Sequence, residues 1–162
     1  MRKKVMYALP LLLVVSVIVT ASSMSYEQQD LREYINRLPL EWVEHALGSI
    51  SFTYSTGTVS IEEKGTAGFI EFFIRKGTHF VVYGLMMIGS YLALIPYRIN
   101  FVWKIITSYL FITLFAVIDE LRHFYHPDRT GLWQDIVLDM TGGLFAVLVI
   151  VIDHHRTSTK GR

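Results

Sequence analysis

The sequence predicts an all-α integral membrane protein. The expected architecture is a bundle of four transmembrane helices, with an extracellular cap of short helices and a short hairpin between helices 1 and 2. Of the 162 residues, 52% are hydrophobic and 18% are charged, whereas a soluble domain contains about 25% charged residues. The hydrophobic residues also gather in long runs. A disordered chain, a coiled coil and a nucleic-acid-binding protein are therefore excluded, and the length indicates a single domain over residues 1–162.

Four runs have the composition of membrane spans. A helix needs about 20 mostly apolar residues to cross the hydrocarbon core. The third run contains Lys104 beside Trp103, where a lysine side chain can extend to the interface. The fourth contains Asp139, but its other residues are almost all apolar. We expect transmembrane helices over about 5–21, 77–97, 99–120 and 135–152.

The charged residues are divided unequally between the two ends of these runs. With the N-terminus inside, the cytoplasmic pieces contain eight of the 15 Lys and Arg residues but one of the 14 acids. Because cytoplasmic loops are enriched in Lys and Arg, we expect both termini to be cytoplasmic and residues 22–76 to be extracellular. The net charge of +1 predicts no nucleic-acid partner, and the lack of cysteine excludes disulfides and thiolate chemistry.

The first run has a second interpretation. Arg2-Lys3-Lys4, an apolar stretch and Ala21-Ser22-Ser23 also match the outline of a secretory signal peptide. However, the uncharged stretch Val5–Ala21 is 17 residues long, and the hydrophobic region of a signal peptide usually has about 7–15. We therefore favour a first helix that is retained.

The extracellular segment has its own pattern of short elements. Asp30 and Glu33 resemble a capping box for a short helix that Pro39 ends, and a second helix is expected over 41–47. We interpret the segment as a packed cap and not as a separate binding domain. The apolar stretch Phe69–Ile74 is expected at the outer interface or as an outward extension of the second span. Alternating apolar residues predict a hairpin around Ser55–Thr58, comprising Ile50, Phe52, Tyr54, Val59 and Ile61.

Ionisable residues gather at the predicted extracellular ends of the spans. Such groups are costly in a membrane, so each needs a reason to be there. Asp135 and Asp139 are four residues apart and share one helix face. Gly142 and Gly143, one turn further on, would allow a helix or a ligand to approach closely. The candidate ligand-binding pocket comprises Arg75, Lys76, His79, Asp119, Glu120, His123, Arg129, Asp135 and Asp139.

This cluster has two interpretations. In the structural one, the acids pair with Arg75, Lys76, Arg122 and Arg129 and hold the helix ends together. In the functional one, the carboxylates bind a hard cation such as Mg²⁺, while Arg75 and Arg129 hold the phosphate or carboxylate of a headgroup. No nucleophile elbow, phosphate-binding loop or HExxH motif is present, so no catalytic residue is identified. The candidate metal ligands are Asp119, Glu120, Asp135 and Asp139.

Three blocks of the sequence resemble the VanZ-like family of small bacterial membrane proteins. The first is Ser22-Ser23 with Tyr26–Gln29. The second, Phe69–Lys76 followed by His79-Phe80, is similar to the family's R-K-x-x-H-F pattern. His123 stands where the family has glutamine, and an imidazole replaces one donor or acceptor of an amide but not both in the same geometry. The third block follows the family order D-E-x-x-Q, R, D-x-x-x-D/N-x-x-G and consists of Asp119-Glu120, Arg129-Thr130-Gly131, Asp135, Asp139 and Gly142-Gly143.

The resemblance implies a role in the bacterial cell envelope, because the founding member is associated with low-level teicoplanin resistance in Gram-positive bacteria. We therefore expect a protein of the bacterial cell membrane that lowers susceptibility to teicoplanin-type lipoglycopeptides. It would engage a membrane lipid or a lipid-linked wall precursor in an acidic pocket at the outer leaflet. The alternative is a membrane enzyme that depends on a divalent metal and acts on a lipid phosphate or polyprenyl phosphate. A proton-coupled transporter ranks below both, because the polar residues do not extend into the cytoplasmic half.

Overall fold

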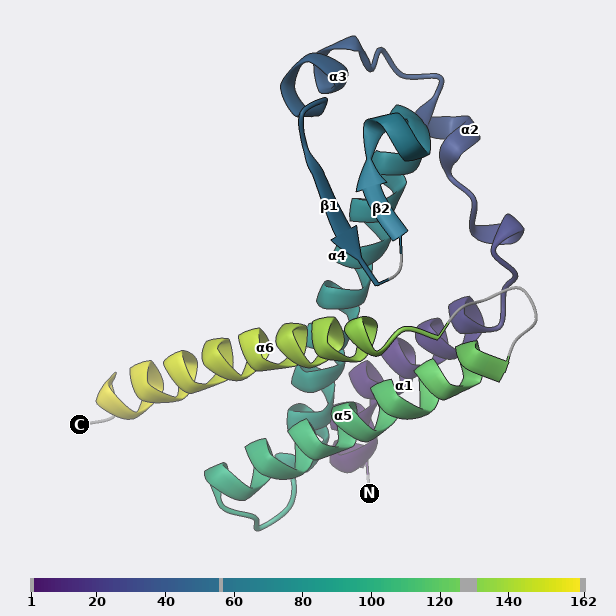
Figure 1. The fold of residues 1–162 in the computed structure, drawn as a ribbon. Coiled ribbons are helices and arrows are strands. Elements are labelled where there is room, and N and C mark those ends of the chain that lie inside the picture. The colour runs from purple at the N-terminus through teal and green to yellow at the C-terminus, as the bar shows by residue number, and fades with distance from the viewer. Residues whose placement is uncertain (1, 56, 126–130, 161–162) are drawn as a thin grey trace. The chain divides into compact units, whose positions relative to one another are not determined.

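The computed structural model describes residues 2–55, 57–125 and 131–160. The chain falls into two compact units: the first comprises Met1–Ser23 and His79–Arg162, and the second comprises Met24–Thr78. The first unit contains long helices. The second contains the short elements and the beginning of a helix that continues into the first (Figure 1).

Among the described residues, four helices are long and apolar enough to cross a membrane, which confirms the predicted fold class. The second of them begins at Ile61, whereas the sequence predicted a span from about residue 77. The stretch Phe69–Ile74 therefore lies within this helix; its placement relative to the outer interface stays a prediction. Near its start Gly65 has φ 69° and ψ 163°, a conformation that glycine adopts at little cost. The four helices are α1 (Arg2–Ser22), α4 (Ile61–Leu94), α5 (Phe101–Tyr125) and α6 (Trp133–Lys160).

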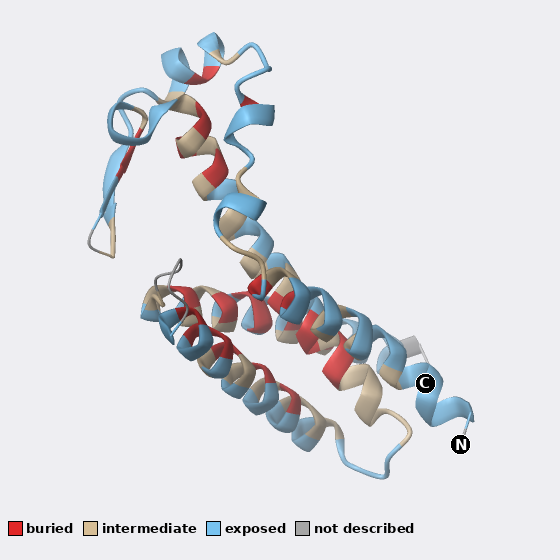
Figure 2. Ribbon diagram, turned by 90° about the vertical axis from the view of Figure 1, so that its right-hand side faces the viewer, coloured by how far each residue is buried: buried red, intermediate tan, exposed pale blue. Residues whose placement is uncertain are grey.

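The helices of the first unit share a hydrophobic core. Figure 2 shows the buried residues on the sides of these helices that face one another. In α1, Leu11, Val14 and Val15 pack against this core and Ile18 is buried in it, so the first helix is part of the bundle. The buried core residues are Ile18, Tyr83, Met86, Met87, Ile112, Ala116, Ala146 and Ile150.

The outer surface of the bundle is apolar, whereas the surface of a soluble protein contains mainly polar and charged side chains. Large hydrophobic side chains point away from the core on α1, α5 and α6, while several acids are buried among the helices. In water these side chains would make a large exposed apolar surface. In a bilayer they contact hydrocarbon. They include Leu12, Leu13, Val17, Leu110, Leu114, Ile118, Leu144 and Leu148.

Glycines allow the helices of this bundle to approach closely. A Cβ on Gly142 of α6 would lie 2.1 Å from the Phe80 carbonyl oxygen of α4. A Cβ on Gly89 of α4 would lie 3.0 Å from the Leu11 backbone of α1. Small residues at helix interfaces are typical of membrane bundles. The close approach predicted for Gly142 and Gly143 is confirmed, since a Cβ on Gly143 would meet the Ile112 side chain at 2.1 Å.

The second unit contains the predicted short elements. Its helices are η1 (Glu27–Gln29), α2 (Arg32–Ile35) and α3 (Glu41–Leu47). The hairpin consists of β1 (Ser51–Tyr54) and β2 (Gly57–Ser60), which pair antiparallel with Phe52 opposite Val59. The second helix and the hairpin therefore lie where the sequence predicted them.

The predicted capping box does not form. Leu31 is the N-cap of α2, with no side-chain cap hydrogen bond. The Asp30 carboxylate instead accepts bonds from the backbone N–H and the Nε of Arg32, both at 2.9 Å. The hydrogen bond from the Arg32 side chain is the largest cause that lowers the pKa of Asp30 to about 2. The aspartate thus bonds its near neighbour because an arginine two residues away offers several donors.

Aromatic side chains join the hairpin to the first turns of α4. The rings of Phe52 and Phe72 are 5.9 Å apart, and those of Tyr54 and Phe72 are 5.2 Å apart. Glu71, which precedes Phe72 in the chain, is 2% exposed. Its carboxylate accepts a hydrogen bond from the Leu31 N–H at 3.4 Å and lies 3.7 Å from Arg32 Nε. This buried carboxylate, which the sequence did not single out, connects α4 to the chain before α2.

We predict that Gly142→Ala destabilises the bundle by about 1–3 kcal/mol, because the new methyl group would overlap the backbone of α4. The measurement is thermal unfolding of the purified protein in detergent. Gly77→Ala is the matched control, since a Cβ there meets nothing within 4 Å. Equal unfolding temperatures for the two variants would contradict the close approach of α4 and α6.

Candidate functional site

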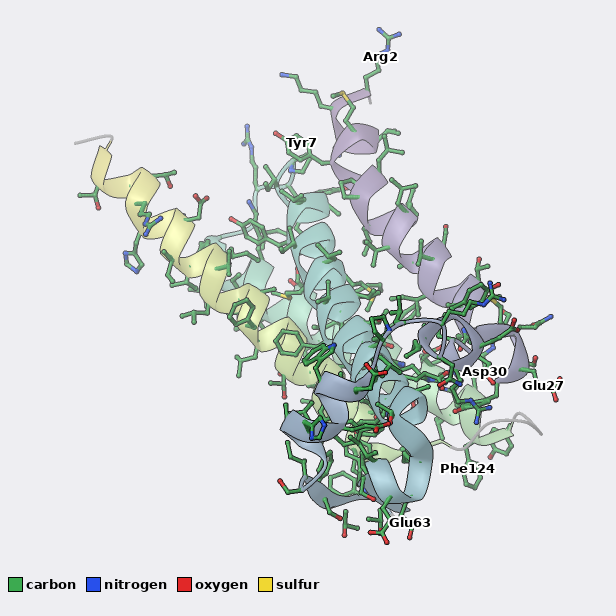
Figure 3. All side chains as sticks on the ribbon, turned by 90° about the horizontal axis from the view of Figure 1, so that it is seen from above. Arg2, Tyr7, Glu27, Asp30, Glu63 and Phe124 are labelled. Atoms are coloured by element: carbon green, nitrogen blue, oxygen red, sulfur yellow. The ribbon has the colours of Figure 1, made fainter. Side chains whose placement is uncertain are left out.

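Polar residues from all four long helices meet at one end of the first unit. This end contains the C-terminal ends of α1 and α5 and the N-terminal part of α6. In Figure 3 it is the end labelled with Phe124, whereas Arg2 and Tyr7 mark the opposite end of α1. The four carboxylates are each no more than 7% exposed. We call this group the acidic site, and it comprises Ser22, His79, Tyr83, Asp119, Glu120, His123, Asp135 and Asp139.

A chain of hydrogen bonds links α1 to α5. The Ser22 hydroxyl donates to Asp119 Oδ1 at 2.6 Å, and its oxygen lies 3.0 Å from His123 Nε2. His123 Nδ1 lies 3.3 Å from Glu120 Oε2. Both ring nitrogens of His123 therefore lie within hydrogen-bond distance of a partner, Ser22 of α1 on one side and Glu120 of α5 on the other.

Glu120 also fixes the start of the chain that leads into α6. Its Oε1 accepts the Leu132 N–H at 2.5 Å. The preceding Gly131 has no room for a side chain, because a Cβ there would lie 2.7 Å from the Glu120 carbonyl oxygen. Both oxygens of this carboxylate are therefore occupied, one by a backbone donor and one by a histidine.

A second pair links α4 to α6. His79 Nδ1 lies 3.2 Å from Asp139 Oδ1, and Asp139 is 2% exposed. Asp135 lies one helical turn before Asp139 and is also buried. The close contact between Gly142 and Phe80 lies directly beside this pair, so it holds the histidine and the acid within hydrogen-bond distance.

Tyr83 lies between the two groups of bonds. Its ring stacks on His79 with centroids 6.5 Å apart and contacts Phe115 of α5 at 6.4 Å. The side chain is 2% exposed, and its hydroxyl has no hydrogen-bond partner among the described residues. Asp139, Asp119 and Glu120 are all close enough to interact with it electrostatically. A buried hydroxyl thus lies in the interior of the bundle, on the tyrosine whose ring stacks on His79.

The predicted cationic residues have other recorded contacts. In the second unit, Arg75 lies over the Tyr26 ring at 4.5 Å and 3.9 Å from Glu71, and Lys76 lies over the Tyr54 ring at 4.7 Å. Arg122 donates to Ser23. Arg129, the remaining predicted cation, lies outside the described residues.

Carboxylates dominate the acidic site. The proposed metal set of Asp119, Glu120, Asp135 and Asp139 stays a prediction. Within residues 2–55, 57–125 and 131–160, no three His, Cys, Asp or Glu side chains are grouped so that they could hold a metal ion.

Sequence reasoning missed Ser22 as a member of the site. The hydroxyl is part of a serine pair that follows the first apolar run, and such pairs commonly only end a helix. Its one sequence signal was its place in the first block of the family resemblance. The link to Asp119 spans 97 residues, so no local pattern could predict it.

We predict that Ser22→Ala destabilises the protein by about 1–3 kcal/mol, because buried Asp119 and His123 each lose a hydrogen-bond partner. Thermal unfolding in detergent measures this. Ser16→Ala is the control on the same helix, since the Ser16 hydroxyl is exposed and bonds only the Leu12 carbonyl one turn earlier. A Ser22 variant as stable as the Ser16 variant would show that the hydrogen bonds of Ser22 do not contribute to the stability of the protein.

The comparisons with known proteins agree with this architecture. A family model described as VanZ/LLP1 matches residues 7–153, a range that includes the whole acidic site. No curated protein and no solved structure matches the chain. The family match covers nearly all of the sequence and all four helices that could span a membrane. The chain belongs to the VanZ/LLP1 family.

Proposed function

We propose that this membrane protein lowers susceptibility to teicoplanin-type lipoglycopeptides. It does so by engaging a lipid or a cell-wall-linked ligand at the acidic site, on the outer leaflet of a bacterial cell membrane. The observation that carries the proposal is the burial of Asp119, Glu120, Asp135 and Asp139 at one end of an otherwise apolar bundle. Ionisable residues inside a membrane protein are a functional-site hypothesis by default.

Two features support binding at this end of the bundle. The acids are held by partners from other helices, Ser22 of α1 and His79 of α4, so the site is assembled before any ligand arrives. The opposite ends of the helices contain flanking cations, such as Arg2, Lys3 and Lys4.

The proposal requires the acidic site to face outwards. We predict that a single cysteine at Thr130, between α5 and α6, reacts with a membrane-impermeant maleimide in intact cells, and that one at Thr157 of α6 reacts only after lysis. The asymmetry of Lys and Arg is the physical reason. The chain has no native cysteine to label. Labelling of Thr157→Cys in intact cells would place the acidic site on the cytoplasmic side and overturn the proposal.

The functional prediction concerns Asp139. In a Gram-positive host, the wild-type protein should raise the inhibitory concentration of teicoplanin over that of empty vector, with little effect on vancomycin. Asp139→Asn should return it to the empty-vector value, because the buried acid loses its charge but keeps its shape. Susceptibility is measured at matched membrane levels of each protein.

Asp153→Asn is the matched control for this experiment. It makes the same chemical change on the same helix, at an exposed position near the other end of α6. It should protect as well as wild type. If wild type gives no protection, or if Asp139→Asn protects fully, the proposed role of the acidic site is wrong.

A further inference from the structure

One row of contacts in the acidic site has the geometry of a serine nucleophile and its base. Ser22 Oγ lies 3.0 Å from His123 Nε2, and His123 Nδ1 lies 3.3 Å from Glu120 Oε2. Each of the three residues is no more than 6% exposed. Many hydrolases activate a serine with a hydroxyl, an imidazole and a carboxylate joined in this order, and such a set is identified by its geometry and not by sequence position.

The other contacts of Glu120 hold the imidazole in the direction of the serine. Glu120 and His123 are three residues apart on α5, so their side chains are neighbours on one face of the helix. The second carboxylate oxygen of Glu120 accepts the Leu132 N–H at 2.5 Å. The carboxylate is therefore fixed from two sides, and the far nitrogen of the imidazole is left toward Ser22 at the end of α1.

The serine hydroxyl has one proton and two acceptors. Its oxygen lies 2.6 Å from Asp119 Oδ1 and 3.0 Å from His123 Nε2. Rotation about the Cβ–Oγ bond of the serine moves the proton from one acceptor toward the other without moving a heavy atom. Activation of the serine requires the proton to be directed to Nε2, in the neutral tautomer of His123 that keeps its own proton on Nδ1.

We propose that Ser22 is the nucleophile of a hydrolase that acts on carboxylic esters of membrane lipids, with His123 as its general base. Ser22 Oγ forms a bond to the ester carbonyl carbon as its proton passes to His123 Nε2. The bond from that carbon to the lipid alcohol oxygen then breaks, and Nε2 returns the proton to this oxygen. Water repeats the two steps on the acyl-serine, which releases a fatty acid and restores the hydroxyl. The proposed function requires binding alone, so this activity goes beyond it.

The position and the charge of the serine's surroundings favour a carboxylic ester. Ser22 is the last residue of α1, which is long and apolar enough to cross a membrane. The ester bonds of membrane lipids lie between the hydrocarbon core and the headgroups, at the depth where such a helix ends. An anionic phosphodiester would have to approach the carboxylates of Asp119 and Glu120, and like charges repel. A carboxylic ester is neutral and avoids this repulsion.

Exposed polar residues lie next to the serine. Ser23 and Arg122 are exposed, and the Arg122 guanidinium donates to the Ser23 hydroxyl. A cation beside the nucleophile can stabilise the negative charge that develops on an ester carbonyl oxygen. The base is a feature of this chain, because the glutamine that the family resemblance predicts at position 123 cannot accept a proton from a serine at neutral pH.

The test measures covalent labelling of the full-length protein in detergent with a long-chain alkyl fluorophosphonate, a reagent that reacts with activated serines. Mass spectrometry of the digested protein gives the labelling rate of each serine. Ser22 should be labelled. Ser23 is the internal control and should stay unlabelled, although it is more exposed, since its hydroxyl is bonded to the Val19 carbonyl and to Arg122.

Two histidine variants test the base. His123→Gln should slow the labelling of Ser22 about 100-fold, because an amide can form hydrogen bonds but cannot take the proton. His155→Gln makes the same change at an exposed position of α6 and should be labelled as wild type is. If His123→Gln unfolds, the contrast between Ser22 and Ser23 in the wild-type protein still decides.

Glu120 acts through the imidazole and is a positioning residue. Glu120→Gln should lower the maximal labelling rate of Ser22 severalfold and leave the half-saturating concentration of the fluorophosphonate unchanged. A purely structural role would not separate the two quantities in this way.

The substrate class is tested with phosphatidylcholine, which contains both carboxylic ester and phosphodiester bonds. The wild-type protein should release fatty acid and no phosphocholine. Release of phosphocholine, failure to release fatty acid, lack of label on Ser22, or labelling of His123→Gln at the wild-type rate overturns the proposal. Ester hydrolysis without protection against teicoplanin disproves the cellular role alone, whereas protection without labelling of Ser22 disproves this inference alone.

Discussion

The structure of the first unit depends on the burial of carboxylates inside an apolar bundle. Removing one charged group from water costs several kcal/mol unless partners replace its hydration. Here the partners come from other helices: Ser22 of α1 for Asp119, His79 of α4 for Asp139, and the backbone of Leu132 for Glu120. Each acid therefore holds two segments of the chain together. The arrangement makes the first helix a contributor to the site as well as to the core.

Close backbone contacts make these pairings possible. The Gly142–Phe80 contact brings α6 against α4 at the residue next to His79 and three residues after Asp139. Any side chain larger than glycine would separate the helices and lengthen that bond. Membrane helices gain little from the hydrophobic effect once they are in lipid, so small residues and interhelical hydrogen bonds are what hold them together. The glycines and the acids thus depend on each other: close packing at glycine sets the distance between the helices, and the polar side chains form hydrogen bonds across that distance.

His123 departs from the family pattern and takes part in the contacts of the acidic site. The family resemblance predicts glutamine there, and the imidazole lies between Ser22 and Glu120 with one nitrogen toward each. The acidic site of this chain therefore combines buried acids with a buried histidine.

The sequence by itself determined the membrane class, the four long helices, the helix over 41–47, the hairpin and the acids at one end, because hydrophobic runs, periodicity and charge asymmetry are local properties of the chain. The prediction of a capping box at Asp30 was wrong. The Asp30 carboxylate accepts hydrogen bonds from the backbone and side chain of Arg32 instead of capping the helix, and the spacing of Asp30 and Glu33 alone does not reveal this competition. Only the tertiary structure decided that Ser22 bonds Asp119, that His79 pairs with Asp139 and that the Tyr83 ring is buried between His79 and Phe115. The physical reason is that these contacts depend on how each helix is rotated and where helices cross. Both are set by core packing and by glycine contacts between residues far apart in the chain.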